Sequence, residues 1–206
     1  MSTPPPPESA TQYVAPRDQP LLYPGRRPTS DFVLSAGNVC KIVCEDDSSS
    51  TLAGGRVWQP SESRFVSLDN FLDANHAAPI AERYPVLAYG SNPVPGQLTS
   101  KFGDAAVVPV FFGRITGWDT VYNLISNWGY AFAEIMQEDE DVVVTTTGIT
   151  FLDAEQLRQM TETEANYHLA HFPDDVVLES GEQLCGSDNG LYVFAGFRKT
   201  WVPEDY

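Results

Sequence analysis

The stretch Val86–Leu98 (VLAYGSNPVPGQL) contains a turn whose residue types are suited to binding an anion. Its apolar run ends at Gly90-Ser91-Asn92, and a proline follows. Asn is a leading N-cap residue and proline is favoured at the first helical position, which predicts a short helix over 93–102. The first turn of that helix would contain no Asp or Glu, so its N–H groups would not already be neutralised. Gly90 would let a ligand approach the backbone and Ser91 would add a hydroxyl, so the turn is suited to a carboxylate.

A second candidate is Glu164, a carboxylate that the apolar pattern places toward the core. We expect a helix over 153–171, in which apolar side chains recur at spacings of three and four. Glu164 completes this stripe, whose other members are Leu157, Met160, Tyr167 and His171. A carboxylate on such a face loses hydration, which favours its uncharged form and prepares it for acid or base catalysis near neutral pH.

Each feature also has an ordinary structural interpretation. Gly-Ser-Asn turns commonly connect a strand to a helix without binding anything. A glutamate at the edge of an apolar stripe can also reach solvent or pair with a buried Arg or Tyr. Ser91 as a nucleophile would need a general base, which the sequence does not place. The residues alone leave these alternatives open.

From Tyr84 onward the chain has the composition of a sheet that would position both features. β-Branched and aromatic residues are concentrated in short runs, and a hairpin turn is expected at the acidic run 138–141. The predicted fold class is α+β, a small mixed, mostly antiparallel β-barrel with flanking helices. The predicted strands cover 85–89, 106–118, 119–125, 130–137, 142–152 and 191–198.

The remainder of the chain divides by composition. Residues 1–29 carry repeated prolines, which predicts a flexible or surface-hugging arm. Residues 30–83 are interpreted as an extension packed on the main domain, or as a small independent subdomain, with Ser67 capping a helix. Residues 84–206 form the predicted main domain.

The charge balance excludes several function classes. With 28 acidic against 12 basic residues, the net charge of −16 argues against binding nucleic acid or an anionic membrane. No apolar run is long enough to span a bilayer, and the N-terminus lacks the features of a secretory signal, so a cytoplasmic location is expected. The three cysteines and three histidines show no disulfide framework or metal-ligand spacing, so no metal or cofactor is expected.

Three segments, in this order, resemble the γ-glutamylcyclotransferase-like superfamily, which includes the plant avirulence-induced-gene-like proteins. LAYGSN at 87–92 resembles its signature loop, NWGYAFAEI at 127–135 its glycine-containing strand, and MTETEANY at 160–167 its helical motif. The resemblance covers roughly residues 86–167. It departs from the usual pattern at Pro93 (usually apolar), Thr161 (usually Asp) and Ala165 (usually Gly).

The resemblance implies a function and a set of residues. Glu164 matches the family's catalytic glutamate, which takes a proton from the α-amine of a γ-glutamyl compound so that the amine closes on the γ-carbonyl. The products are 5-oxoproline and a free amine or amino acid, and no cofactor is implied. The implied substrate-binding residues are Tyr89, Gly90, Ser91, Asn92, Tyr167, Gly129 and Tyr130.

Other functions on the same scaffold remain open. One is a different acyl chemistry, such as removing a γ-glutamyl protecting group. Another is a non-catalytic member that binds a small anionic metabolite or a protein partner. The sequence gives neither the leaving group nor the oligomeric state.

Overall fold

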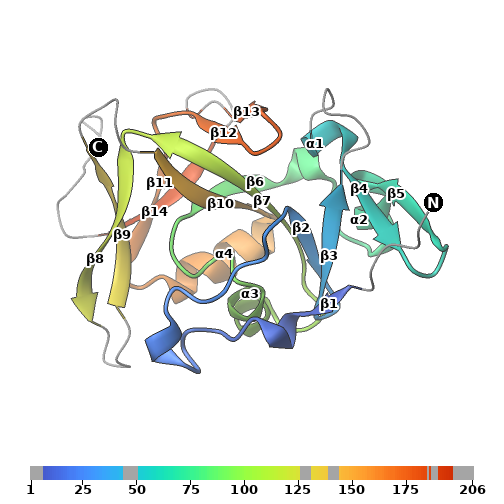
Figure 1. Ribbon diagram of the computed structural model, residues 1–206, viewed down its shortest axis with the longest axis horizontal. Coiled ribbons are helices and arrows are strands. Elements are labelled where there is room, and N and C mark those ends of the chain that lie inside the picture. Colours follow the sequence, from blue (N-terminus) through green and yellow to red (C-terminus); the bar gives the residue numbers. More distant parts are fainter. Residues whose placement is uncertain are drawn as a thin grey trace.

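The fold is α+β and is built around one large, mostly antiparallel sheet (Figure 1). The computed structural model describes residues 7–43, 51–125, 131–138, 144–184, 186 and 190–196. The sheet contains, in spatial order, β11 (Tyr167–His171), β14 (Tyr192–Gly196), β6 (Tyr84–Ala88), β10 (Val144–Leu152), β7 (Val107–Thr116), β2 (Phe32–Ser35), β3 (Asn38–Val43), β4 (Arg56–Gln59) and β5 (Arg64–Ser67). Of these neighbours, β6 and β14 alone pair in parallel.

Short elements complete the sheet and cover it. Strand β1 (Glu8–Ser9) pairs with β3, and β12 (Val176–Leu178) pairs with both β7 and β13 (Gln183–Leu184). Strands β8 (Trp118–Ile125) and β9 (Ala131–Gln137) form a separate two-stranded sheet. The helices are α1 (Thr51–Gly54), α2 (Leu68–Ala74), α3 (Pro95–Phe102) and α4 (Ala154–Thr163), with 3-10 turns η1 (Ala10–Gln12), η2 (Pro20–Leu22) and η3 (Ile80–Glu82).

The α+β class and the strands expected after Tyr84 are confirmed, whereas a closed barrel is not found. Within the described residues the strand pairings form an open series that begins at β11 and ends at β5, and these two strands do not pair with each other. The turn expected at 138–141 lies, for residues 139–141, outside the described part of the chain.

Alternating side chains give the sheet two apolar faces. In β7, Val110 and Phe112 belong to a core cluster that also contains Leu98 of α3 and Met160 of α4. Phe111, between them, belongs to the other cluster, which includes the buried side chains of α2. This is the period-2 pattern of a strand buried on both faces. Helices α3 and α4 therefore lie together against one face, as Figure 1 shows.

The helix expected over 153–171 is too long, and this prediction is corrected. Helix α4 begins as expected, with a capping box between Asp153 and Gln156, but it ends at Thr163 with Glu164 as its C-cap. Residues 167–171 instead form β11, which pairs with β14. The apolar spacing that suggested one helical stripe belongs to a helix and a strand in succession, because all five residues from Tyr167 to His171 pair with β14.

The N-terminal segment, of which residues 7–29 are described, packs closely on the rest of the chain. Ala10 and Tyr13 are buried in the cluster that contains α3, and Ala15 is buried as well. The backbone of Tyr13 lies directly against α3, because a Cβ added at Gly96 would come within 1.9 Å of the Tyr13 carbonyl oxygen. Strands β2 and β3 share the central sheet with β7. The domain boundaries at 29/30 and 83/84 stay predictions.

Gly96→Ala is expected to destabilise the protein, although alanine is the better helix former. An exposed helical Gly→Ala change gains about 0.5–1 kcal/mol. Here the added methyl meets backbone atoms of Tyr13 and Ala15, which no side-chain rotation can relieve. We expect a loss of about 1–3 kcal/mol in urea unfolding and faster trypsin cleavage after Arg17. A gain in stability would show that the N-terminal segment does not pack on α3.

Asp31 is a buried carboxyl group that makes stability depend on pH. Its side chain is 8% exposed and accepts a hydrogen bond from the Phe112 N–H at 2.8 Å. Burial, and to a smaller extent the charge of Glu179, raise the pKa of Asp31 from 3.8 to about 6. The folded state therefore holds this proton more tightly than the unfolded state, so stability is highest below pH 3.8 and is lost as the pH rises through about 6.

Asp31→Asn is accordingly expected to flatten the pH dependence of unfolding. The asparagine oxygen can still accept from Phe112, and the cost of ionising a buried group is removed. Relative to the parent, the variant should gain roughly 2–3 kcal/mol between pH 4 and pH 7. Urea unfolding at several pH values measures this gain. A difference between the two proteins that is the same at every pH would contradict it.

None of the helices described here is long and apolar enough to cross a bilayer. The described ranges also contain no group of three or more His, Cys, Asp or Glu side chains arranged to hold a metal ion. The expected cytoplasmic location stays a prediction.

Candidate functional site

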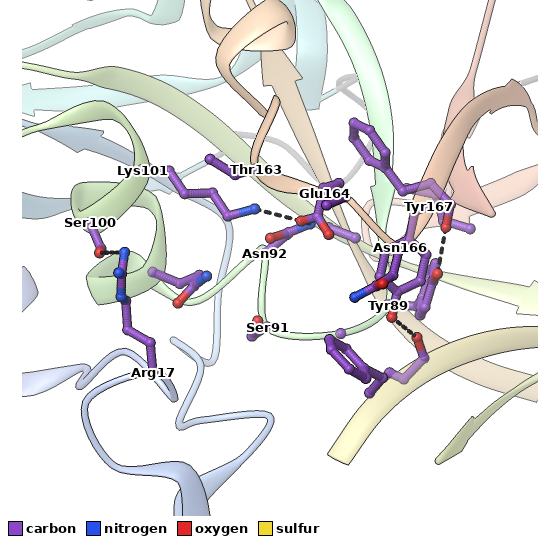
Figure 2. Close-up of a pocket in the computed structure, with 18 of the residues that line it drawn as sticks. Arg17, Tyr89, Ser91, Asn92, Ser100, Lys101, Thr163, Glu164, Asn166 and Tyr167 are labelled. Atoms are coloured by element: carbon purple, nitrogen blue, oxygen red, sulfur yellow. Dashed lines mark hydrogen bonds and ion pairs between the residues drawn. The ribbon is translucent and has the colours of Figure 1, made fainter. Parts of the chain in front are cut away.

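A cavity of about 880 Å³ lies where the end of β6, helix α3 and the end of α4 meet (Figure 2). Strands β9 and β14 contribute to its wall, and the N-terminal segment contributes to its rim. The polar and charged side chains that line it are those of Arg17, Asp18, Tyr89, Ser91, Asn92, Gln97, Ser100, Lys101, Thr163, Glu164, Asn166 and Tyr167.

Glu164 sits in this cavity beside the loop that follows β6. Its Oε1 accepts a hydrogen bond from Asn92 Nδ2 at 3.0 Å and forms an ion pair with Lys101 Nζ at 2.5 Å. The side chains of Lys101 and Glu164 are only 6% and 15% exposed, so the pair is largely shielded from water. Both contacts use the same oxygen, and within the described residues Oε2 accepts no hydrogen bond. The carboxylate is therefore fixed by one oxygen and available through the other.

Lys101 is one of the site residues that the sequence did not predict. Its Nζ also lies 3.1 Å from Met160 Sδ, so the ammonium contacts α4 as well. A lone lysine near the end of a short helix normally faces solvent. The available signal was its position three residues after Leu98, which puts Lys101 on the buried side of α3.

The loop Tyr89–Asn92 lines the cavity, but it does not begin a helix as expected. Helix α3 begins at Pro95 with Val94 as its N-cap, and the Val94 N–H donates to the Ser91 carbonyl at 2.9 Å in a turn. Val94 is extended because a residue that precedes proline disfavours the helical region. Asn92 therefore caps nothing and its amide is directed to Glu164.

The helix N-terminus predicted directly after Asn92 is thus not found, and the loop itself is what remains of the predicted anion site. The first turn of α3 is covered by the backbone of Tyr13 at Gly96. The loop itself retains free donors, because the backbone N–H groups of Gly90, Ser91 and Asn92 donate to no other described residue. Three successive N–H groups beside a cavity can hold a carboxylate.

The N-terminal segment also holds this loop in place, through hydrogen bonds to its carbonyl oxygens. Arg27 Nη2 donates to the carbonyl oxygens of Tyr89 at 3.0 Å and Gly90 at 2.7 Å. Burial lowers the pKa of Arg27, as expected for a cation removed from water. A Cβ at Gly90 would come within 2.9 Å of the Tyr23 hydroxyl, so Gly90 is needed for this close packing. Loop carbonyls are therefore satisfied while loop N–H groups are left for a ligand.

Two tyrosines form one wall of the cavity. The Tyr89 hydroxyl donates to the Phe194 carbonyl at 2.5 Å, and the Tyr167 hydroxyl donates to the Ala133 carbonyl at 2.7 Å. Burial raises the pKa of Tyr89 well above its ordinary value, so this phenol stays protonated. Both side chains are anchored to strands, which suits them to shape the cavity.

The positions that depart from the family pattern have separate explanations. Thr161 is exposed and its hydroxyl donates to the Leu157 carbonyl within α4, at 2.8 Å. Pro93 packs on β10, where a Cβ at Gly148 would meet the proline ring at 2.6 Å. Ala165 lines the cavity beside Glu164. Gly129 and Tyr130, also expected at the site, lie outside the described residues.

Comparisons with known proteins give distant likenesses. No protein-family model and no curated protein sequence matches this chain. A solved structure of a γ-glutamyl cyclotransferase is 14% identical over 56% of this chain and 67% of its own, with a TM-score of 0.45. An uncharacterized protein from Homo sapiens is 16% identical over the same shares, also with a TM-score of 0.45. An Arabidopsis thaliana protein solved in solution is 13% identical over 60% of this chain and 78% of its own, with a TM-score of 0.43. A γ-glutamyl cyclotransferase is thus among the structures to which this chain has a distant likeness.

Proposed function

We propose that this protein is a cyclotransferase-like enzyme that converts a γ-glutamyl compound into 5-oxoproline and a free amine or amino acid. The observation that carries the proposal is the arrangement of Glu164. Its Oε1 is fixed by Asn92 and Lys101, its Oε2 accepts from no described residue, and a loop with three free N–H groups lies beside it. A base and an anion-binding loop on adjacent elements are what this cyclisation requires.

In the proposed reaction, the loop holds the α-carboxylate of the substrate. Oε2 of Glu164 takes a proton from the neighbouring α-ammonium, and the neutral amine nitrogen attacks the γ-carbonyl carbon. The new C–N bond closes the five-membered ring, and the bond from the γ-carbon to the leaving nitrogen breaks. Glu164 passes its proton to that nitrogen, then takes the second proton that the ring nitrogen loses on becoming the lactam N–H and passes it to the released amine, which leaves as an ammonium. Because nucleophile and electrophile belong to one molecule, positioning and proton transfer supply the catalysis.

Lys101 fits this proposal as a positioning residue. The Lys101 ammonium, 2.5 Å from Oε1, holds that oxygen through a charge-assisted hydrogen bond. Asn92 and Lys101 together prevent rotation of the carboxylate and keep Oε2 as the oxygen available to substrate.

The same ion pair favours a second candidate, a non-catalytic binding protein. A carboxylate that already receives a charged and a neutral donor has part of its hydrogen-bonding capacity satisfied without any reaction. In that case the loop would hold a small anionic metabolite, and Glu164 would serve the structure of the cavity.

Incubation of the full chain with γ-glutamyl-alanine and with glutathione, with 5-oxoproline followed by mass spectrometry, separates the two candidates. Time-dependent 5-oxoproline from either compound supports the enzyme. A rise in melting temperature with millimolar glutamate or 5-oxoproline, without turnover, supports the binding protein. Neither product nor a shift would contradict both.

A further inference from the structure

The cavity extends well beyond the space that a γ-glutamyl group needs. Pockets of about 300–1,000 Å³ accept drug-sized ligands, and this one measures about 880 Å³. Its reactive end lies at Glu164 and the loop after β6. Its other end lies at the rim formed by α3 and the N-terminal segment, where Figure 2 shows Arg17 beside Ser100. A substrate that reacts at Glu164 has its leaving group available to this rim.

Of the two cations that line the cavity, Lys101 and Arg17, only Arg17 has no acidic partner among the described residues. Lys101, the other cation of the lining, is paired with Glu164 at 2.5 Å. Arg17 is exposed, and its Nη1 donates to the neutral Ser100 hydroxyl at 3.0 Å. Within the described residues it forms no ion pair with an acidic side chain. The guanidinium therefore has N–H donors left for an anion, in a planar geometry that matches a carboxylate.

The backbone that presents Arg17 is fixed. The preceding residues, Ala15 and Pro16, are buried, and the N–H groups of Asp18 and Gln19 close a turn onto the Ala15 carbonyl at 2.9 and 3.3 Å. The segment just before this turn lies against Gly96 of α3. The ordered backbone removes one part of the conformational entropy that binding an anion through Arg17 would otherwise cost.

We propose that Arg17 is a specificity residue that binds a carboxylate on the leaving group of the substrate. The inference rests on the proposed function and extends it to a part of the substrate that Glu164 does not touch. The enzyme then prefers γ-glutamyl compounds whose leaving group carries a free carboxylate over those whose leaving group is uncharged. Asp18, on the same rim, carries the opposite charge and limits this preference.

The test compares two substrates that differ by one charge, γ-glutamyl-alanine and γ-glutamyl-alaninamide. The parent chain should favour the first in kcat/KM. Arg17→Gln should lower kcat/KM for γ-glutamyl-alanine about tenfold, chiefly through KM, and leave the amide unchanged. Arg17→Lys should recover part of the loss. Asp18→Asn should increase the preference, and Arg158→Gln, on the exposed face of α4, should match the parent.

Two results would overturn the inference. One is an equal loss on both substrates in Arg17→Gln, and the other is no loss on either. If the parent makes no 5-oxoproline at all, the proposed function fails, and calorimetric titration of the two compounds then decides the role of Arg17 separately. Weaker binding of γ-glutamyl-alanine alone in Arg17→Gln would keep the role of Arg17. Equal binding by parent and variant, or no binding by either, would remove it.

Discussion

Glu164→Gln is expected to lower the rate of 5-oxoproline formation by about 10²–10⁴-fold, the usual contribution of a positioned general base. Glutamine has the same shape and keeps an oxygen that can accept from Asn92 and Lys101. It cannot take a proton from the substrate amine at neutral pH. The loss should therefore appear in kcat, with KM changed little.

Glu162→Gln is the matched control, because Glu162 lies two residues earlier on α4 and its side chain is 62% exposed and paired with Arg158. Its turnover should equal that of the parent. Circular dichroism and size-exclusion chromatography should show that both variants keep the fold. Parental turnover in Glu164→Gln would remove Glu164 as the base.

Lys101→Met is expected to destabilise the protein by about 3–5 kcal/mol, because it leaves the largely buried carboxylate of Glu164 without its cation. Methionine retains most of the aliphatic volume beside Met160, so loss of packing contributes little. The expected measurement is a lower free energy of unfolding in urea at neutral pH.

The double variant Lys101→Met/Glu164→Gln isolates the ion pair, because it removes both charges together. Its stability should recover most of the loss seen in Lys101→Met alone, as a coupling energy between residues in contact. Additive losses in the double variant would show that the pair is not coupled. A loss below about 1 kcal/mol in Lys101→Met would show that Glu164 is solvated in the folded protein.

The strands could be predicted because their signals are local. In β7 and β10, β-branched and aromatic residues occur at the spacing of buried strands, and this pattern favours strand over helix before any partner is known. The cap at Ser67 was likewise predictable, since its hydroxyl needs only the N–H of Asn70, three residues away.

The errors arose where distant residues compete with local preference. Spacing alone extends the predicted helix to residue 171, because a helical stripe and a following strand can share apolar positions. Pairing with β14, a strand more than twenty residues later in the chain, decides the end of α4 and makes Glu164 its C-cap. Helix α3 starts two residues later than predicted for a local reason, the extended conformation that Pro95 imposes on Val94.

By itself, the sequence determined the α+β class, the strands after Tyr84, and the residue types that could do chemistry, Glu164 and the Gly90–Asn92 turn. Tertiary structure alone decided that these two lie together, that Lys101 fixes one oxygen of the carboxylate, and that Arg17 and Arg27 reach the same site from the N-terminal segment. The physical reason is that hydrophobic periodicity and capping act between near neighbours in the chain. An ion pair or a hydrogen bond across a cavity depends instead on distances that only the packed sheet and helices set.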